Sequence, residues 1–142
     1  MMYVSGIPSS KVNDVWDRCK KFIEMGNNKS QQEMNVDDIY EKLLTTDMQL
    51  WMVFSEDAEI VSVLTTEVVL YPRIKTCRIV TLGGKDMDDW VEQFLEVLEE
   101  WALENDCVAM ETACRKGFIK KLEKYGYEHT YTILTKKLQT LQ

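Results

Sequence analysis

A β-prone segment ends in two glycines and leads directly into the strongest helical pattern of the chain. The segment covers residues 76–84, and the helix follows at Met87–Glu104. Such a turn directs free backbone amides and the positive end of the helix dipole at one point, as in many anion-binding sites. The turn also carries Asp86, Asp88 and Asp89, whose carboxylates repel a phosphate but stabilise a helix N-terminus. Two interpretations therefore stay open: a phosphate-binding turn, or an ordinary strand-to-helix turn with Asp86 or Asp88 as the N-cap.

Apolar periodicity predicts the order of strands and helices along the chain. The expected strands cover residues 3–7, 50–54, 59–71, 76–82, 107–113 and 127–138. The expected helices run from Pro8 to Gly26, follow an N-cap at Asn35, and cover residues 87–104 and 115–125. Consecutive strands come first and a β-α-β pattern comes later. We therefore expect one α/β domain over residues 1–142, with a mixed, mainly antiparallel sheet and helices on both faces.

Charge and hydropathy argue against several classes of partner. The chain has 142 residues and a net charge of −7. Nucleic acid is not expected as the main partner, because phosphate binding needs a basic surface. No apolar run is long enough to span a membrane, and the N-terminus lacks the basic and apolar regions of a signal peptide. We therefore expect a cytoplasmic protein without a membrane segment.

The cysteines and the histidine show no metal-binding pattern. Cys19, Cys77, Cys107 and Cys114 form no C-x-x-C pair, and His129 is the single histidine. We therefore expect neither a metal site nor a disulfide framework, and we interpret the cysteines as buried, reduced thiols.

The element order and two local motifs resemble the GNAT superfamily of N-acetyltransferases. Residues 115–127 read Arg-Lys-Gly-Phe-Ile-Lys-Lys-Leu-Glu-Lys-Tyr-Gly-Tyr and resemble the fourth helix of that fold, with its closing lysine-x-glycine-aromatic motif. Residues 84–90, Gly-Lys-Asp-Met-Asp-Asp-Trp, together with residues 115–118, are also similar to small GNAT-like proteins of tailed bacteriophages. The resemblance is best over residues 60–142.

The resemblance implies acetyl-CoA as the cofactor and a place for it. In that fold the pantetheine arm enters a gap between two parallel strands, here residues 76–82 and 107–113, and pairs with the first like an added strand. The pyrophosphate lies on the turn into the long helix, and the start of the fourth helix lies beside the nucleotide. The cofactor-binding residues implied for this chain are Val80, Leu82, Gly83, Gly84, Lys85, Arg115 and Lys116. For the last two, a solvated basic helix face is the alternative.

The chain departs from the family's motifs at two positions. The family's phosphate cradle reads Arg/Gln-x-x-Gly-x-Gly/Ala, whereas residues 82–87 read Leu-Gly-Gly-Lys-Asp-Met. The tyrosine that often acts as general acid in the family is replaced here by Leu122, which has no proton to donate. Both departures count against catalysis in the usual geometry.

Glu67 and Glu111 are the carboxylates that remain for a general base, and the candidate is Glu111. It alternates with Cys107, Ala109 and Ala113 along a strand whose face we expect to be partly buried. Burial there would raise the pKa of the carboxyl group, which suits a base that works near neutral pH. The alternative is that Glu111 pairs with a lysine or arginine, or reaches solvent at the strand end.

Two classes of function stay open. The first is an acyl-CoA-dependent N-acetyltransferase with a degenerate cofactor loop, which transfers acetyl to a small-molecule or protein amine. The second is a catalytically inactive GNAT-fold phage protein, acting in the host cytoplasm or on the virion as a binding module. Its basic protein partner would meet the acidic outer face of the long helix, formed by Glu92, Glu96, Glu99 and Glu100. A sensor that binds CoA without chemistry lies between the two.

The acceptor and the oligomeric state are not specified by any motif. In the GNAT fold the acceptor meets loops, which correspond here to residues 27–33 and 71–75. Neither loop contains a pattern that identifies an amine. Residues 135–142 either extend a strand into a neighbouring molecule or fray.

Overall fold

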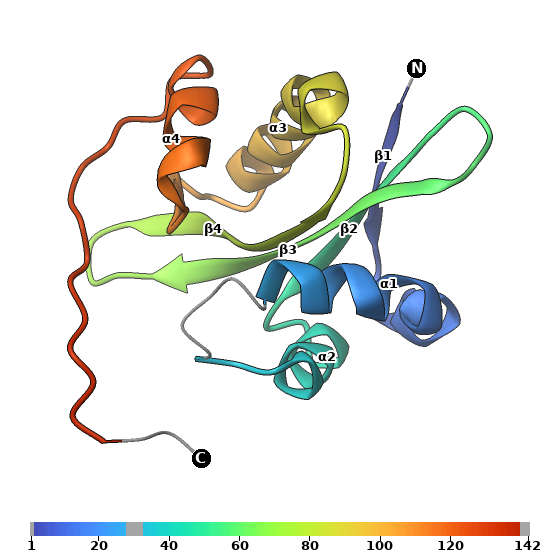
Figure 1. Cartoon of the computed structure of the whole chain (residues 1–142), viewed down its shortest axis with the longest axis horizontal. Coiled ribbons are helices and arrows are strands. Elements are labelled where there is room, and N and C mark those ends of the chain that lie inside the picture. The colour runs from blue at the N-terminus through green and yellow to red at the C-terminus, as the bar shows by residue number, and fades with distance from the viewer. Residues whose placement is uncertain (1, 28–32, 140–142) are drawn as a thin grey trace.

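The computed structural model describes residues 2–27 and 33–139 of the chain (Figure 1). The strands are β1 (Tyr3–Ile7), β2 (Gln49–Phe54), β3 (Ile60–Leu70), β4 (Lys75–Gly84) and β5 (Ala109–Thr112). The helices are the short 3-10 helix η1 (Ser9–Lys11), α1 (Val12–Asn27), α2 (Val36–Leu44), α3 (Met87–Glu104) and α4 (Lys116–Glu123). The strands form a five-stranded sheet in the order β1-β2-β3-β4-β5, antiparallel except for the parallel pair β4–β5. The predicted mixed, mainly antiparallel sheet is confirmed.

Helices cover both faces of this sheet, as the sequence predicted (Figure 1). On one face, Ile23 of α1 and Ile39 of α2 share a buried cluster with Met52 of β2. On the other face, Phe94 of α3 and Leu122 of α4 belong to a second buried cluster. The sheet therefore separates two hydrophobic cores, and each helix pair buries its apolar stripe against one of them.

The two helix starts that the sequence singled out form in different ways. Asn35 is the N-cap of α2, as predicted, and forms a capping box in which Asn35 and Asp38 each accept a hydrogen bond from the other's backbone amide, at 2.9 and 3.0 Å. α3 has the predicted bounds, with Asp86 as its N-cap. Asp86 has a left-handed backbone with φ of 57°, and its side chain makes no capping hydrogen bond. At α3 the carboxylates therefore act through the helix dipole.

The predicted last strand, residues 127–138, is wrong. In the described part of the chain, residues 127–139 pair with no strand, and residues 128–139 are exposed. A β-prone segment becomes a strand only where a neighbouring edge supplies hydrogen-bond partners, and this segment leaves the sheet instead of lying beside β5. β5 is also shorter than expected, because the Cys107 amide bonds to Ala102 at the end of α3. Most of the expected loop at residues 27–33 and the last residues, 140–142, lie outside the described residues.

Helix α1 lies against β4 so closely that backbone contacts backbone. A Cβ atom on Gly26 would lie 2.9 Å from the carbonyl oxygen of Leu82. A Cβ atom on Gly83 would overlap the carbonyl oxygen of Phe22. Both glycines are therefore required by packing, since any side chain would force α1 away from the strand.

We predict that Gly83→Ala lowers the free energy of unfolding by about 2–3 kcal/mol, because the added methyl group has no space. Urea denaturation measures this loss. The matched control is Gly117→Ala in α4, where no atom lies within 4 Å of the added Cβ. Alanine there favours the helix and should raise stability by up to about 1 kcal/mol. An unchanged stability for Gly83→Ala would contradict the close packing of α1 on β4.

Candidate functional site

The parallel strands β4 and β5 pair for only a short distance and then part. Their register runs from the pair Thr76 and Ala109 to the pair Ile79 and Thr112. Beyond this point β4 continues to Gly84, whereas the chain after β5 turns into α4. The two strands therefore diverge, and the gap between them opens beneath α3 and α4.

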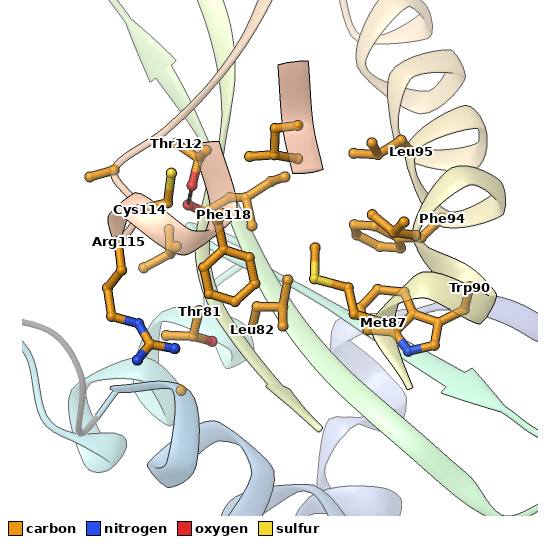
Figure 2. A pocket seen from close by; sticks show the side chains of 16 residues that line it. Thr81, Leu82, Met87, Trp90, Phe94, Leu95, Thr112, Cys114, Arg115 and Phe118 are labelled. Carbon is orange, nitrogen blue, oxygen red and sulfur yellow. Dashed lines mark hydrogen bonds between the residues drawn. The ribbon is translucent and has the colours of Figure 1, made fainter. Parts of the chain in front are cut away.

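A pocket lies in this gap (Figure 2). Its wall comes from the end of α1, the second half of β4, the first turns of α3, the end of β5 and α4. Most of the wall is apolar, and its largest side chains are Leu82, Met87, Trp90, Phe94, Phe118 and Leu122. The polar side chains in the wall are Thr81, Thr112, Cys114 and Arg115, together with the Trp90 indole N–H, which donates to the Lys85 carbonyl at 2.7 Å. An apolar cleft with a few polar groups is typical of cofactor and small-molecule sites.

A β-bulge in β4 lies in the wall of this pocket. Thr65 of β3 pairs with Thr81, but the next residue, Thr66, pairs with Ile79, so Val80 has no partner opposite it. The hydroxyl groups of Thr65 and Thr81 form a buried hydrogen bond at 2.7 Å, which fixes the strand next to the bulge. Bulges disrupt a ladder locally and are common beside active sites. Val80 and Leu82, which the sequence predicted as cofactor-binding residues, both line the pocket.

The other residues predicted at the glycine turn lie outside the pocket wall. Gly84 belongs to β4 and has a φ of 151°, and a Cβ atom there would lie 2.5 Å from the Val61 carbonyl oxygen. The Lys85 amide donates to the same carbonyl at 3.2 Å. Gly83 packs against α1, as described above. The two glycines therefore have structural reasons to be there, and the Lys85 amide already has a partner.

Arg115 stands in the pocket wall, at the N-cap of α4. Its guanidinium lies 5.5 Å from the centre of the Phe118 ring. Figure 2 shows this side chain beside the ring, at the edge of the set of pocket-lining side chains. Lys116 follows as the first residue of α4, is exposed and does not line the pocket. Among the described residues of the pocket wall Arg115 is the cationic side chain, so it is the better placed of the two to meet an anionic ligand.

Glu111 lies in a cluster of polar side chains near the point where the strands part. Tyr71 donates a hydrogen bond to its carboxylate at 2.8 Å, and Thr76 donates a second. Arg78 forms ion pairs with Glu111 at 3.3 Å and with Glu67 at 3.0 Å. This is the ion-pair alternative that the sequence left open, built from two carboxylates around one arginine.

The expectation of a raised pKa for Glu111 is wrong. Burial alone would raise the pKa of this carboxyl group. The hydrogen bonds from Thr76 and Tyr71 and the charge of Arg78 outweigh burial, so the pKa lies below its ordinary value of 4.5. Glu111 is therefore ionised at neutral pH and is a weaker base than the sequence suggested.

Groups that transfer protons are scarce in the pocket wall. Leu122, at the position of the family's tyrosine, is buried and lines the pocket. The nearby Tyr127 hydroxyl donates to Glu99 at 3.1 Å, and burial raises the pKa of this tyrosine. Cys114 also lines the pocket, but its side chain is exposed, so the expected burial of this cysteine is wrong. Partial desolvation still raises the pKa of its thiol, which stays protonated at neutral pH. Within the described residues, the wall includes no aspartate, glutamate, histidine or tyrosine.

Sequence reasoning assigned Trp90 to the core and did not identify the α3 and α4 side chains of the pocket wall. Trp90 is buried, as predicted, and it also borders the pocket. Phe118, Met87 and Leu82 point toward one another across the gap (Figure 2). The sequence signal for these side chains was the apolar stripe of α3. Apolar periodicity predicts which face of a helix is buried, but it does not predict whether a pocket lies against that face.

Metal-ligating clusters and membrane-spanning helices are both absent from residues 2–27 and 33–139. No group of three or more metal-ligating side chains comes together there. No helix there combines the length and the apolar character that a membrane crossing requires.

Solved acetyltransferase structures share this fold. Glucosamine-6-phosphate N-acetyltransferase from Arabidopsis thaliana has 14% sequence identity and a TM-score of 0.68, over 98% of this chain and 99% of that one. A predicted acetyltransferase from Clostridium acetobutylicum, solved with acetyl-CoA, has 14% identity and a TM-score of 0.69, over 97% of both chains. An aminoglycoside acetyltransferase from an uncultured soil metagenomic sample, in complex with sisomicin, has 11% identity and a TM-score of 0.67, over 97% of both chains.

These likenesses confirm the GNAT-like fold expected from the sequence, and at such low identity they show the fold alone. No protein-family model matches the chain, and no curated protein matches it in sequence.

We predict that Glu111→Gln destabilises the protein by about 1–3 kcal/mol at neutral pH, because Arg78 loses a charged partner. A carboxyl group with a lowered pKa stabilises the folded state above its unfolded pKa, and this contribution is lost as the pH falls through the folded pKa. The difference between wild type and variant should therefore shrink when urea denaturation is repeated near pH 3. Glu104→Gln, at the exposed end of α3, is the control and should change little at either pH. A difference that is independent of pH would contradict the lowered pKa.

Proposed function

We propose that this protein is an acyl-CoA-dependent N-acetyltransferase. The observation that carries the proposal is the pocket between the diverging strands β4 and β5, beside the bulge at Val80. A parallel pair that parts in this way leaves room for an extended ligand between the strands. The Clostridium acetobutylicum structure with acetyl-CoA supports acyl-CoA as the class of ligand.

The pocket wall fits the parts of such a ligand. In this proposal Val80 and Leu82 contact the pantetheine arm, and the unpaired backbone at Val80 offers it hydrogen bonds. Arg115 and Lys116 bind phosphate, since a guanidinium forms charge-assisted hydrogen bonds with phosphate oxygens. Gly83 and Gly84 hold the turn close to α1 and β3, and Lys85 adds positive charge at the start of α3.

The cofactor would supply an acyl group activated as a thioester. The task of the chain is then to orient this group, exclude water and remove a proton from the attacking amine. The apolar side chains around Phe118 serve the first two tasks. For the third we propose Glu111, acting directly or through a water molecule, and its low pKa makes it a weak base with a modest contribution.

The polar cluster around Glu111 suits an amine acceptor. Cys77 and Ile79 belong to the core beneath α3, so Arg78 between them faces the α1–α2 side of the sheet. There Glu67 and Glu111 place two carboxylates against one guanidinium. The excess negative charge favours a cationic small-molecule or protein amine, a class to which the sisomicin of the soil metagenomic enzyme belongs.

We predict that millimolar acetyl-CoA raises the melting temperature of the protein by several degrees. A ligand that binds only the folded state at about 100 times its Kd adds about 2.7 kcal/mol of stability. Arg115→Glu reverses the charge in the pocket wall and should weaken binding by about tenfold or more, equivalent to about 1.4 kcal/mol. Differential scanning fluorimetry over a range of acetyl-CoA concentrations measures both effects.

The control variant is Lys120→Glu, which makes the same charge change on α4 at an exposed position outside the pocket wall. It should keep the wild-type response. Gly84→Glu is unsuitable as a binding-deficient variant, because its positive φ and close packing against Val61 would damage the fold itself. The absence of any shift at saturating acetyl-CoA would overturn both the enzyme and the sensor proposals.

A second candidate function is a binding module that has lost catalysis, as in a phage protein of this fold acting in the host cytoplasm or on the virion. The observation that favours it is the lack of acidic, histidine and tyrosine side chains in the described pocket wall. Its partner surface would be the exposed glutamates of α3, Glu92, Glu96 and Glu100. Glu99, which the sequence placed in this surface, is not part of it, because its side chain is half-buried and accepts a hydrogen bond from Tyr127.

This alternative predicts that Glu96→Lys weakens a basic protein partner captured with the wild type, and leaves the melting temperature unchanged. Glu104→Lys, also exposed but at the end of α3, is the comparison variant. Pull-down with quantitative mass spectrometry gives the measurement. A partner bound equally by wild type and Glu96→Lys would exclude this face as its binding surface.

A further inference from the structure

Helix α3 carries an exposed row of acidic side chains at a regular spacing. Every fourth residue from the second position of the helix is acidic and exposed, and we call this set the acidic row: Asp88, Glu92, Glu96, Glu100 and Glu104. Residues four apart are neighbours on a helix surface, and like charges at this spacing repel one another. The acidic row therefore destabilises α3 unless groups of opposite charge lie against it.

Helix α4 carries an exposed row of lysines at the same spacing. We call this set the basic row, and it comprises Lys116, Lys120 and the C-cap residue Lys124. With a rise of about 1.5 Å per residue, the basic row is about 12 Å long. Glu92, Glu96 and Glu100 in the acidic row cover the same length. The two rows therefore match in spacing and are opposite in sign.

Most of these charges have no partner of opposite sign among the described residues. Asp88 forms an ion pair with Lys121 at 3.5 Å, which links α3 to α4. The other members of the two rows form no ion pair within residues 2–27 and 33–139. Both helices cover the same face of the sheet (Figure 1). This side of the molecule therefore presents an acidic and a basic row on adjacent helices.

A surface with two such rows is complementary to itself. A two-fold axis that passes between α3 and α4 places α3 of one copy against α4 of the other, and the same contact occurs twice. Each chain has a net charge of −7, so two copies repel one another as a whole, whereas in this orientation opposite charges meet. A foreign basic protein would neutralise the acidic row alone, but a second copy neutralises both rows.

We propose that two copies of this protein associate through these helices, with the basic row of each copy against the acidic row of the other. Charged side chains at an exposed contact are screened by salt, so the association is weak and depends on ionic strength. The contact does not require a cofactor. It therefore holds or fails separately from the proposed acyltransferase activity.

The test is the mass of the full-length protein in solution, measured by sedimentation equilibrium at low salt and at about 0.5 M NaCl. Wild type should have twice the 16.6 kDa mass of one chain at low salt and the mass of one chain at high salt. Glu96→Lys and Lys120→Glu each bring like charges together, so both should be monomeric at low salt. Asp17→Lys and Lys20→Glu make the same charge changes at exposed positions of α1, on the opposite face of the sheet, and should stay dimeric.

A mixture of the two monomeric variants tests the reciprocal contact itself. Equal amounts of Glu96→Lys and Lys120→Glu should form a mixed dimer at low salt, because the introduced lysine of one copy meets the introduced glutamate of the other. A wild type that is monomeric at low salt overturns the proposal, even if a foreign basic protein binds the acidic row. A dimer that persists in both variants, or a mixture that stays monomeric, overturns it as well, because the contact then lies elsewhere.

Discussion

The parting of β4 and β5 after Ile79 and Thr112 is the constraint on which the candidate site depends. Two features hold the strands in this arrangement. The bulge at Val80 interrupts the ladder with β3, and the glycine contact between α1 and β4 fixes the strand beyond the bulge. β4 is held by α1, whereas the chain after β5 turns away into α4. The gap between the strands therefore stays open, and side chains of α3 and α4 border it. The backbone geometry of β4 and β5 therefore creates the space of the site, and the side chains determine its chemical character.

Much of the fold could be predicted from the sequence, because periodicity and capping are local signals. The bounds of α3 and the N-cap at Asn35 are confirmed. The strand predicted at residues 127–138 failed, since a strand also needs a neighbour, and composition does not say whether one is in reach. The glycines show a similar limit: Gly83 and Gly84 mark a close approach of backbones, but the sequence does not tell whether a phosphate or a helix approaches.

The candidate site could be predicted less completely, because its electrostatics depend on tertiary contacts. Val80, Leu82 and Arg115 line the pocket, and their role in binding a cofactor stays a prediction. The partners of Glu111 come from β3–β4 and could not be inferred from its own strand, so the direction of its pKa shift was wrong. In the proposed function, a cofactor pocket poor in proton-transfer groups next to a charged cluster fits slow catalysis, in which the chain mainly orients the reactants.

The measurement that tests the central claim most directly is amide hydrogen exchange with and without acetyl-CoA. We predict slower exchange at residues 79–82 of β4, in the first turns of α3, and at the start of α4, with little change in α2. This pattern would place the ligand in the gap between β4 and β5. Protection confined to other elements, or no change at saturating acetyl-CoA, would contradict the assignment of this pocket as an acyl-CoA site.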